Sequence, residues 1–345
     1  MHRFSKMMKA RRLRIFSSLC LGFLAVLQAD TGYSQSTGKV TKQVDGPQLK
    51  GPISEGVGKQ EDSAPVGKTQ SADLAYGAFQ RGYYLTALRL ALPRAEAGDP
   101  AAQTLIAEIY WNGLGVAINR KEAAAWYKFA ADAGDRSAQF AYANILLRGL
   151  LVDTDTKAGR ELMQKAAESG NIQAQFNLAQ IITASRPTWA GFKQALPWYQ
   201  KAAEAGLADA QYALSNIYAE AKGVVTNDEE KARLWLKRAA EGGLDSAQVE
   251  YGIWLVNGRG GPKNEKEAFV WFQRAAAQRN VLAQNRLSRM YAFGIGTDKD
   301  PIKAAAWHIL ARRAGYKDND MDQRFGTYTA IDKRRALELA NRLGK

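Results

Sequence analysis

The sequence has almost no cysteine or histidine. Cys20 is the only thiol in the 345 residues, and His2 and His308 are the only imidazoles. A disulfide framework needs cysteines in pairs, and a structural zinc site needs about four cysteine or histidine ligands. We therefore expect a fold that depends on no disulfide, metal or cofactor.

Proline and runs of β-branched residues are also scarce. The chain has nine prolines, and alanine is abundant in long stretches between the glycines. Alanine is the best helix former, whereas β-branched and aromatic residues favour strands. The composition therefore favours an all-α protein.

The middle of the chain has almost no net charge. Residues 72–258 carry 19 basic and 20 acidic side chains, whereas residues 259–345 carry 18 basic and 9 acidic ones. The first 34 residues carry 6 basic side chains and 1 acidic one. The formal net charge of +14 therefore comes mostly from the two ends.

The N-terminus lacks an apolar run long enough to span a membrane. Six basic residues precede a run of thirteen residues from Ile15 to Leu27, whereas a transmembrane helix needs about 20. This pattern predicts a signal peptide over residues 1–34, cleaved after Ala29 or, preferably, Ser34. We expect a periplasmic or secreted protein with no stable membrane span once the leader is removed. An uncleaved signal anchor is the alternative.

Residues 35–71 lack any apolar periodicity. They are rich in Gly, Pro, Ser, Gln and Lys. Such a segment cannot bury enough apolar surface to offset its ordering entropy. We predict a disordered linker there.

One short motif recurs from residue 102 onwards. An Ala-Gln pair returns at steps of 36, 36, 36, 37 and 36 residues. A glycine lies five residues before each glutamine, with Arg279 as the exception, and a large apolar residue lies thirteen residues before it. Because the Ala-Gln pair, the glycine and the large apolar residue recur with the same period, they predict a repeat protein. The glutamines are Gln103, Gln139, Gln175, Gln211, Gln248 and Gln284.

Each period has the pattern of two helices joined by a loop. Apolar residues at helical spacing follow Gln103, and Gly113 and Gly115 then end the first helix. Asn119 can cap a second helix, whose apolar face includes Trp126. One pair cannot bury its apolar faces alone, so the pairs are expected to stack.

The pattern A-Q-x-x-L/Y…G-x-G…A-x-x-W-Y/F-x-x-A-A-x-x-G resembles the Sel-one-like repeat, a relative of the tetratricopeptide repeat. The resemblance implies a right-handed α/α solenoid of about seven helix pairs over residues 72–318. It also implies an adaptor or scaffold that binds a protein. A C-terminal cap is expected over residues 319–345, with its last helix starting near Thr329.

Several positions depart from the pattern. Leu162 occupies a tryptophan position, and Leu151 stands where a loop glycine belongs. Pro197 lies inside a second helix, where it removes a backbone hydrogen bond and is expected to kink the helix. Trp189 has no counterpart in the other repeats, so it either anchors a partner or fills the irregular fourth pair.

Catalytic constellations are sparse. The loop Gly-x-Gly pairs follow helices and lack the lysine of a phosphate-binding loop, so we interpret them as turns. His308 has no cysteine or serine motif near it in sequence and is interpreted as a packed or surface histidine. We predict no catalytic, cofactor or metal residues.

The leading functional prediction is an exported interaction scaffold with one or more protein partners. Residues 306–310 are similar to exported regulators of sensor kinases, which implies a role in envelope signal transduction. The alternatives are a cell-wall or β-lactam hydrolase of the same repeat family and an envelope polymer-binding protein. Export disfavours nucleic acid as a partner. An acidic partner is expected from the basic C-terminal end, and the candidate contact residues are Trp189, Arg312, Arg313, Lys333, Arg334 and Arg335.

Overall fold

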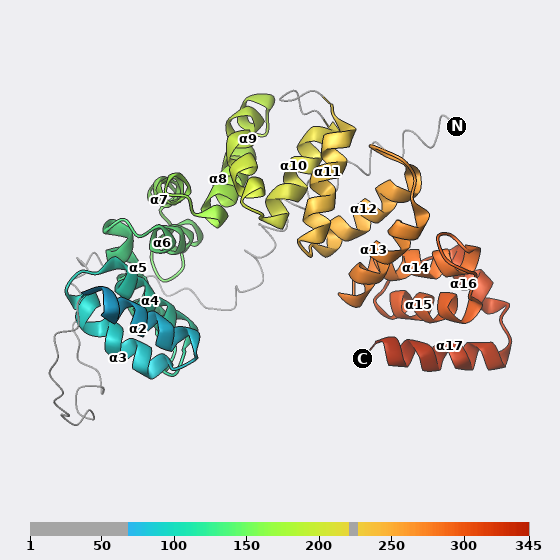
Figure 1. Ribbon diagram of the computed structural model, residues 1–345, viewed down its shortest axis with the longest axis horizontal. Coiled ribbons are helices and arrows are strands. Elements are labelled where there is room, and N and C mark those ends of the chain that lie inside the picture. Colours follow the sequence, from blue (N-terminus) through green and yellow to red (C-terminus); the bar gives the residue numbers. More distant parts are fainter. Residues whose placement is uncertain (1–67, 221–226, 345) are drawn as a thin grey trace. The chain divides into compact units, whose positions relative to one another are not determined.

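The computed structural model describes residues 68–220 and 227–344, and all regular elements in these ranges are helices (Figure 1). The predicted signal peptide and the linker up to residue 67 lie outside the described residues. The described residues fall into two compact units, which divide between Ala174 and Gln175. None of the described helices is both long and apolar enough to cross a membrane.

The described part of the first unit contains three helix pairs, and consecutive helices pack against each other. The pairs join α2 with α3, α4 with α5, and α6 with α7. The helices are α2 Lys68–Gln80, α3 Tyr84–Glu96, α4 Pro100–Asn112, α5 Arg120–Asp132, α6 Arg136–Arg148 and α7 Thr156–Glu168.

The second unit repeats this arrangement. Its boundary falls in the first turn of α8, and consecutive helices from α9 to α15 pack against each other. The helices are α8 Ile172–Ser185, α9 Trp189–Glu204, α10 Ala208–Glu220, α11 Glu229–Glu241, α12 Asp245–Asn257, α13 Glu265–Ala277, α14 Val281–Phe293, α15 Pro301–Arg313, α16 Asn319–Gly326 and α17 Ala330–Leu343. The predicted all-α fold of about seven helix pairs is confirmed.

The Ala-Gln motif joins a helix pair to the one before it in four of the six repeats. The buried amide Nε2 of Gln103 donates to the carbonyl oxygen of Ala95 at 3.0 Å, in the last turn of the preceding second helix. That carbonyl belongs to the helix end, where backbone acceptors lack intrahelical donors. The glutamine therefore helps to cap the neighbouring helix. The glutamines with this bond are Gln103, Gln139, Gln211 and Gln248.

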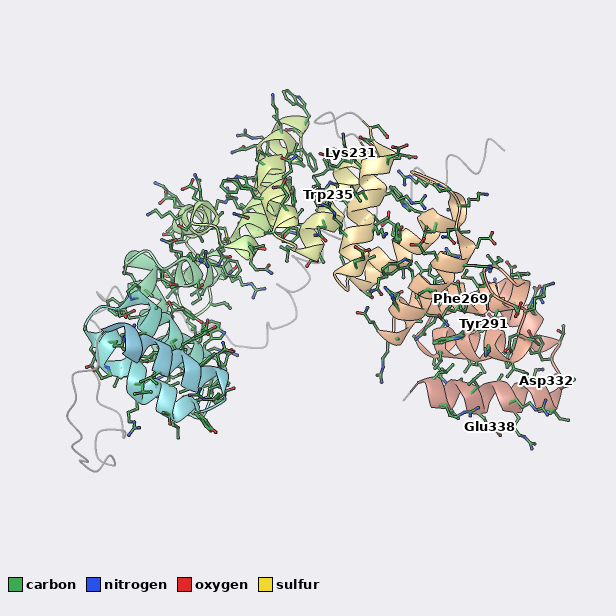
Figure 2. All side chains as sticks on the ribbon, viewed as in Figure 1. Lys231, Trp235, Phe269, Tyr291, Asp332 and Glu338 are labelled. Atoms are coloured by element: carbon green, nitrogen blue, oxygen red, sulfur yellow. The ribbon has the colours of Figure 1, made fainter. Side chains whose placement is uncertain are left out.

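The core consists of alanines at helix contacts and large residues between them. Trp126 and Trp271 are 4% and 5% exposed, whereas Trp235 (labelled in Figure 2) is only partly buried. Phe269 and Tyr291 meet edge to face with their ring centroids 5.2 Å apart (Figure 2). Small residues at the crossings let the helices approach closely enough for these rings to fill the remaining space.

The second glycine of the loop motif is required by close packing. A side chain at Gly296 would overlap the carbonyl oxygen of Glu265, at the start of the second helix one pair earlier. Among the described residues, two that are not glycine adopt the left-handed backbone conformation, which glycines adopt at the corresponding positions of other repeats. They are Leu151 in its loop, with φ 68°, and Arg279 before α14, with φ 63°.

The ends of the array differ slightly from expectation. α2 begins at Lys68, inside the segment predicted as linker, because a helix can extend by backbone bonds without an apolar side chain. In the fourth pair, α9 includes Pro197 within one helix, and the kink expected there stays a prediction. α17 packs against α15 (Figure 1), and Thr329 caps α17 through the backbone N–H of Asp332 at 3.1 Å, as predicted.

Candidate interaction surface

The first helix of each repeat has a half-buried side with no constant residue type. The position five residues after each motif glutamine is neither fully buried nor fully exposed in any of the six repeats. Five of the six side chains there are polar. We call this position, with the positions two and nine residues after the glutamine, the first-helix face. The six central residues are Glu108, Asn144, Gln180, Asn216, Ile253 and Arg289.

Burial changes the chemistry of this face in the first unit. Burial, with a smaller contribution from the carboxylate of Asp135, raises the pKa of Glu108. Asn144 uses its amide to donate to the carbonyl oxygen of Phe140 at 2.9 Å, one turn back in α6. The amide oxygen and the second amide N–H of Asn144 can still bond to other groups.

In the second unit, neighbouring first helices are linked across this face. The Tyr212 hydroxyl on α10 donates to Glu250 Oε2 on α12 at 2.6 Å. Burial, and then the charge of Glu250, raises the pKa of Tyr212, so the phenol stays protonated as the donor. The two helices are thereby fixed relative to each other within this unit.

On the exposed side of the second helices, several charged side chains interact with other side chains of the same helix. Lys201, Arg238 and Arg274 each lie over the repeat tryptophan three residues earlier, with the charge 4.5 to 4.6 Å from the ring centroid. Lys128 and Lys237 pair with an acidic residue four positions later. Because these charges already have partners within the same helix, this side is the weaker candidate for binding a protein.

Trp189 is the first residue of α9 and is 62% exposed. The interpretation that its ring fills the core of the fourth pair is therefore wrong. A large apolar ring held in solvent at a helix start is available for a partner.

Two of the predicted basic residues lie at the end of α15 and are engaged within the protein. Arg312 Nε lies 3.2 Å from Asp322 Oδ1, and Arg313 Nη2 donates to Asn341 Oδ1 on α17 at 2.9 Å. Both side chains remain exposed. Their charges thus help to hold the terminal helices to α15.

The other three lie on α17. Lys333 Nζ donates to the carbonyl oxygen of Gly326 at 2.8 Å. Arg334 and Arg335 are exposed, and no hydrogen bond or ion pair of theirs is present in the described part of the chain. α17 packs on α15, but Arg313 lies beside Asn341 near the end of α17, whereas the three basic residues of α17 lie in its first half. Arg334 and Arg335 are the two whose charges face solvent without a partner.

His308 is a packed histidine, as the sequence indicated. It is 2% exposed, and its Nε2 lies 2.8 Å from Asp322 Oδ1. Its Nδ1 is buried without a hydrogen-bond partner in the described residues. Within those residues, no group of three or more His, Cys, Asp or Glu side chains is placed to hold a metal ion.

The first-helix face was not identified from the sequence. The 3.6-residue period places positions two, five and nine after the glutamine on one side of a helix. Nothing in the period says how much of that side the neighbouring pairs leave open. Residues such as Gln180 and Arg289 could be aligned in the repeat, but their half-buried environment is a property of the stacked helices.

Comparisons with known proteins agree with this architecture. The chain is similar to c5321, a protective antigen present in uropathogenic Escherichia coli strains that displays an SLR fold, with 27% identity and a TM-score of 0.67. The match covers 80% of this chain and 60% of that one, so the chain spans about 60% of the length of that protein. A Sel1 repeat protein from Oxalobacter formigenes is 27% identical with a TM-score of 0.61, over 72% of this chain and 99% of the other. No curated protein matches the sequence.

The Sel1 repeat model matches six consecutive segments, each of which contains one helix pair from α4 to α15. The segments are residues 100–135, 136–171, 172–207, 208–244, 245–280 and 281–316. These matches cover more than half of the chain, and the protein belongs to the Sel1 repeat family, whose members commonly mediate protein–protein interaction.

Proposed function

We propose that this protein is an exported interaction scaffold that binds a protein partner through its first-helix face. The observation that carries the proposal is the contrast between the two kinds of repeat position. Positions that pack the helices keep one residue type, as the buried motif glutamines do, whereas the half-buried position five residues later changes from Glu108 to Arg289. A surface that stacking does not constrain can carry residues chosen for a partner.

Photo-crosslinking in cells tests this proposal. A photoreactive amino acid is placed at Gln180 on the first-helix face, and in a matched variant at Gln194 on the exposed side of α9. Crosslinked products are identified by mass spectrometry. We expect a discrete protein adduct from position 180 and none from position 194. Adducts of equal yield from both positions would contradict the assignment of the surface.

Export is part of the same proposal and has a separate test. The basic residues and short apolar run before residue 28 support a cleaved leader. Mass spectrometry of the protein's N-terminal peptide should place the mature start near Asp30 or Gln35. Recovery of intact Met1 in the membrane fraction would instead support the uncleaved anchor.

The partner is expected to be acidic near the C-terminal end of the second unit, where Arg334 and Arg335 are unpaired. An envelope sensor protein among the crosslinked products would identify the scaffold as a regulator of signalling. The hydrolase alternative is supported by no comparable observation, because the one described histidine, His308, is directed at Asp322 inside the fold.

A further inference from the structure

A small cavity opens between the first helices α12 and α14 in the second unit. Its volume is about 240 Å³, and its lining is mostly apolar. Phe272 and Met290, both almost fully buried, lie among the lining residues together with Ile253 and Val256 of α12. Pockets for drug-sized ligands and cofactors have volumes of about 300–1,000 Å³. This cavity is therefore suited to a single amino-acid side chain rather than to a cofactor.

Two arginines of α14, Arg286 and Arg289, line the same cavity, and their surroundings differ. Arg289 donates to both carboxylate oxygens of Asp318 at 2.7 and 3.0 Å and is held there. The Nε of Arg286 is buried and has no hydrogen-bond partner in the described residues, and no ion pair of Arg286 is present there either. Arg286 as a whole is half-buried beside the apolar lining, and its guanidinium has no paired carboxylate within the described residues.

Glu250 on α12 and Asp318, just before α16, are two carboxylates that already have partners. Glu250, at the repeat position of Arg286 one pair earlier, accepts the hydroxyl proton of Tyr212. Asp318 accepts from Asn285 at 2.7 Å as well as from Arg289. A half-buried guanidinium that no carboxylate of the protein occupies can pair with an incoming carboxylate, and such a pair is stronger beside an apolar lining than in open solvent.

We propose that this cavity binds the C-terminal residue of the protein partner, with a large apolar side chain in the cavity and the terminal carboxylate on Arg286. A C-terminal residue is the smallest unit that supplies one apolar side chain and one carboxylate together. The guanidinium group can bind a carboxylate through two parallel hydrogen bonds. Asn257 is also in the lining, and its amide is a group that can hydrogen-bond to a peptide group.

This inference rests on the proposed function, since it names the chemistry of the partner on one part of the first-helix face. It is tested on the full-length purified protein with short peptides, without the cellular partner. If the peptides do not bind, the crosslinking result at Gln180 is still valid. If the crosslinking gives no adduct, the peptide-binding test is still valid.

The probe is an acetylated pentapeptide, Ac-Gly-Ser-Gly-Ser-Leu, with a free C-terminal carboxylate. Its matched control is the same peptide with a C-terminal amide. The protein carries isotope-labelled isoleucine and methionine methyl groups, and the peptides are titrated while the methyl resonances of Ile253, Ile295 and Met290 are recorded. We expect these three methyl groups to shift with the acid, and binding of the amide to be at least tenfold weaker.

Variants separate the charge from the cavity. Arg286→Gln should weaken binding of the acid at least tenfold, and Val256→Phe should abolish it because the added ring fills the cavity. Arg274→Gln, on the exposed side of α13 outside the cavity, should leave binding unchanged. Circular dichroism confirms that each variant is folded.

Three outcomes would overturn the proposal. One is equal binding of acid and amide by the wild-type protein. Another is wild-type affinity in a folded Arg286→Gln protein. The third is tighter binding of an internal acidic peptide, Ac-Gly-Ser-Leu-Glu-Gly-amide, than of the free acid, which would place a side-chain carboxylate on Arg286 instead.

Discussion

Replacement of Trp271 by alanine tests the packing of the repeat most sharply. The ring is 5% exposed and meets Tyr251 edge to face with centroids 5.6 Å apart. Its Nε1 donates to Glu267 Oε1 at 3.3 Å, and Arg274 lies over its face at 4.5 Å from the centroid. Trp271→Ala removes all of these interactions and leaves a cavity between α12 and α13.

The expected loss of unfolding free energy follows from the buried area. A tryptophan buries about 150–250 Å², which at about 25 cal/mol per Å² corresponds to about 4–6 kcal/mol as an upper bound. Tryptophan-to-alanine changes in cores cost about 3–5 kcal/mol, and an edge-to-face pair contributes about 0.5–1.5 kcal/mol beyond its area. We expect a loss of about 4 kcal/mol for Trp271→Ala. Trp235, the equivalent residue one pair earlier, is only partly buried, and about 2 kcal/mol is expected there.

Urea unfolding followed by far-ultraviolet circular dichroism measures the difference. Circular dichroism is preferred because removal of a tryptophan also changes the fluorescence signal. In repeat proteins each interface adds its own contribution, so the midpoint and the cooperativity of unfolding are both compared. Equal losses for the two variants, or a loss below about 1 kcal/mol for Trp271→Ala, would refute the packing argument.

Further predictions concern the motif glutamine, the loop and the terminal cap. Gln248→Leu should lower the free energy of unfolding by about 1 kcal/mol more than Gln211→Leu in the same urea assay. The reason is that Gln248 makes hydrogen bonds through both amide atoms, whereas Oε1 of Gln211 has no partner in the described residues. Equal losses would contradict a stabilising role for the second hydrogen bond of Gln248. Leu151→Gly should raise the free energy of unfolding by up to about 1 kcal/mol, because glycine adopts the left-handed backbone conformation at this position without strain. A lower urea midpoint in this variant would show that the contacts of the leucine side chain outweigh the backbone strain. Burial alone would raise the pKa of Asp318, but its hydrogen bonds from Asn285 and Arg289 outweigh this and hold the pKa below its usual value. The stabilisation from the ionised Asp318 is therefore present above the unfolded-state pKa of about 3.9 and is lost below about pH 4, as pH falls through the lower folded-state pKa. Asp318→Asn should lower the free energy of unfolding at pH 7 by about 1.5–3 kcal/mol, and should make it fall less steeply below about pH 4. An unchanged dependence of the unfolding free energy on pH in Asp318→Asn would contradict a stabilising role for the Asp318 carboxylate.

The repeat and its helix pairs could be predicted from the sequence because packing requires the same residue types in every period. The Ala-Gln pairs mark a contact that recurs in four of the six repeats, where the glutamine side chain reaches the end of the preceding helix. The capping pair Thr329 and Asp332 is equally local, which is why the start of α17 could also be predicted.

The interaction surface could be predicted only in part. Arg312 and Arg313 were chosen for their charge, but the sequence gives no indication that they pair with α16 and α17. Arg286 could not be predicted, because it shares its cavity with residues of another repeat, such as Ile253, that are more than 30 positions away in sequence. Local patterns predict what a helix buries, whereas unpaired groups appear only when the helices are stacked.

The central claim is that the first-helix face binds the protein partner, and one pair of variants tests it most directly. Gln180→Arg places a bulky charge on that face, and Gln194→Arg places the same charge on the exposed side of the next helix. Affinity for the crosslinked partner is measured by isothermal titration calorimetry with folded proteins. We predict that Gln180→Arg weakens binding at least tenfold, about 1.4 kcal/mol, while Gln194→Arg leaves it unchanged. Loss of affinity in Gln194→Arg with full affinity in Gln180→Arg would contradict the claim.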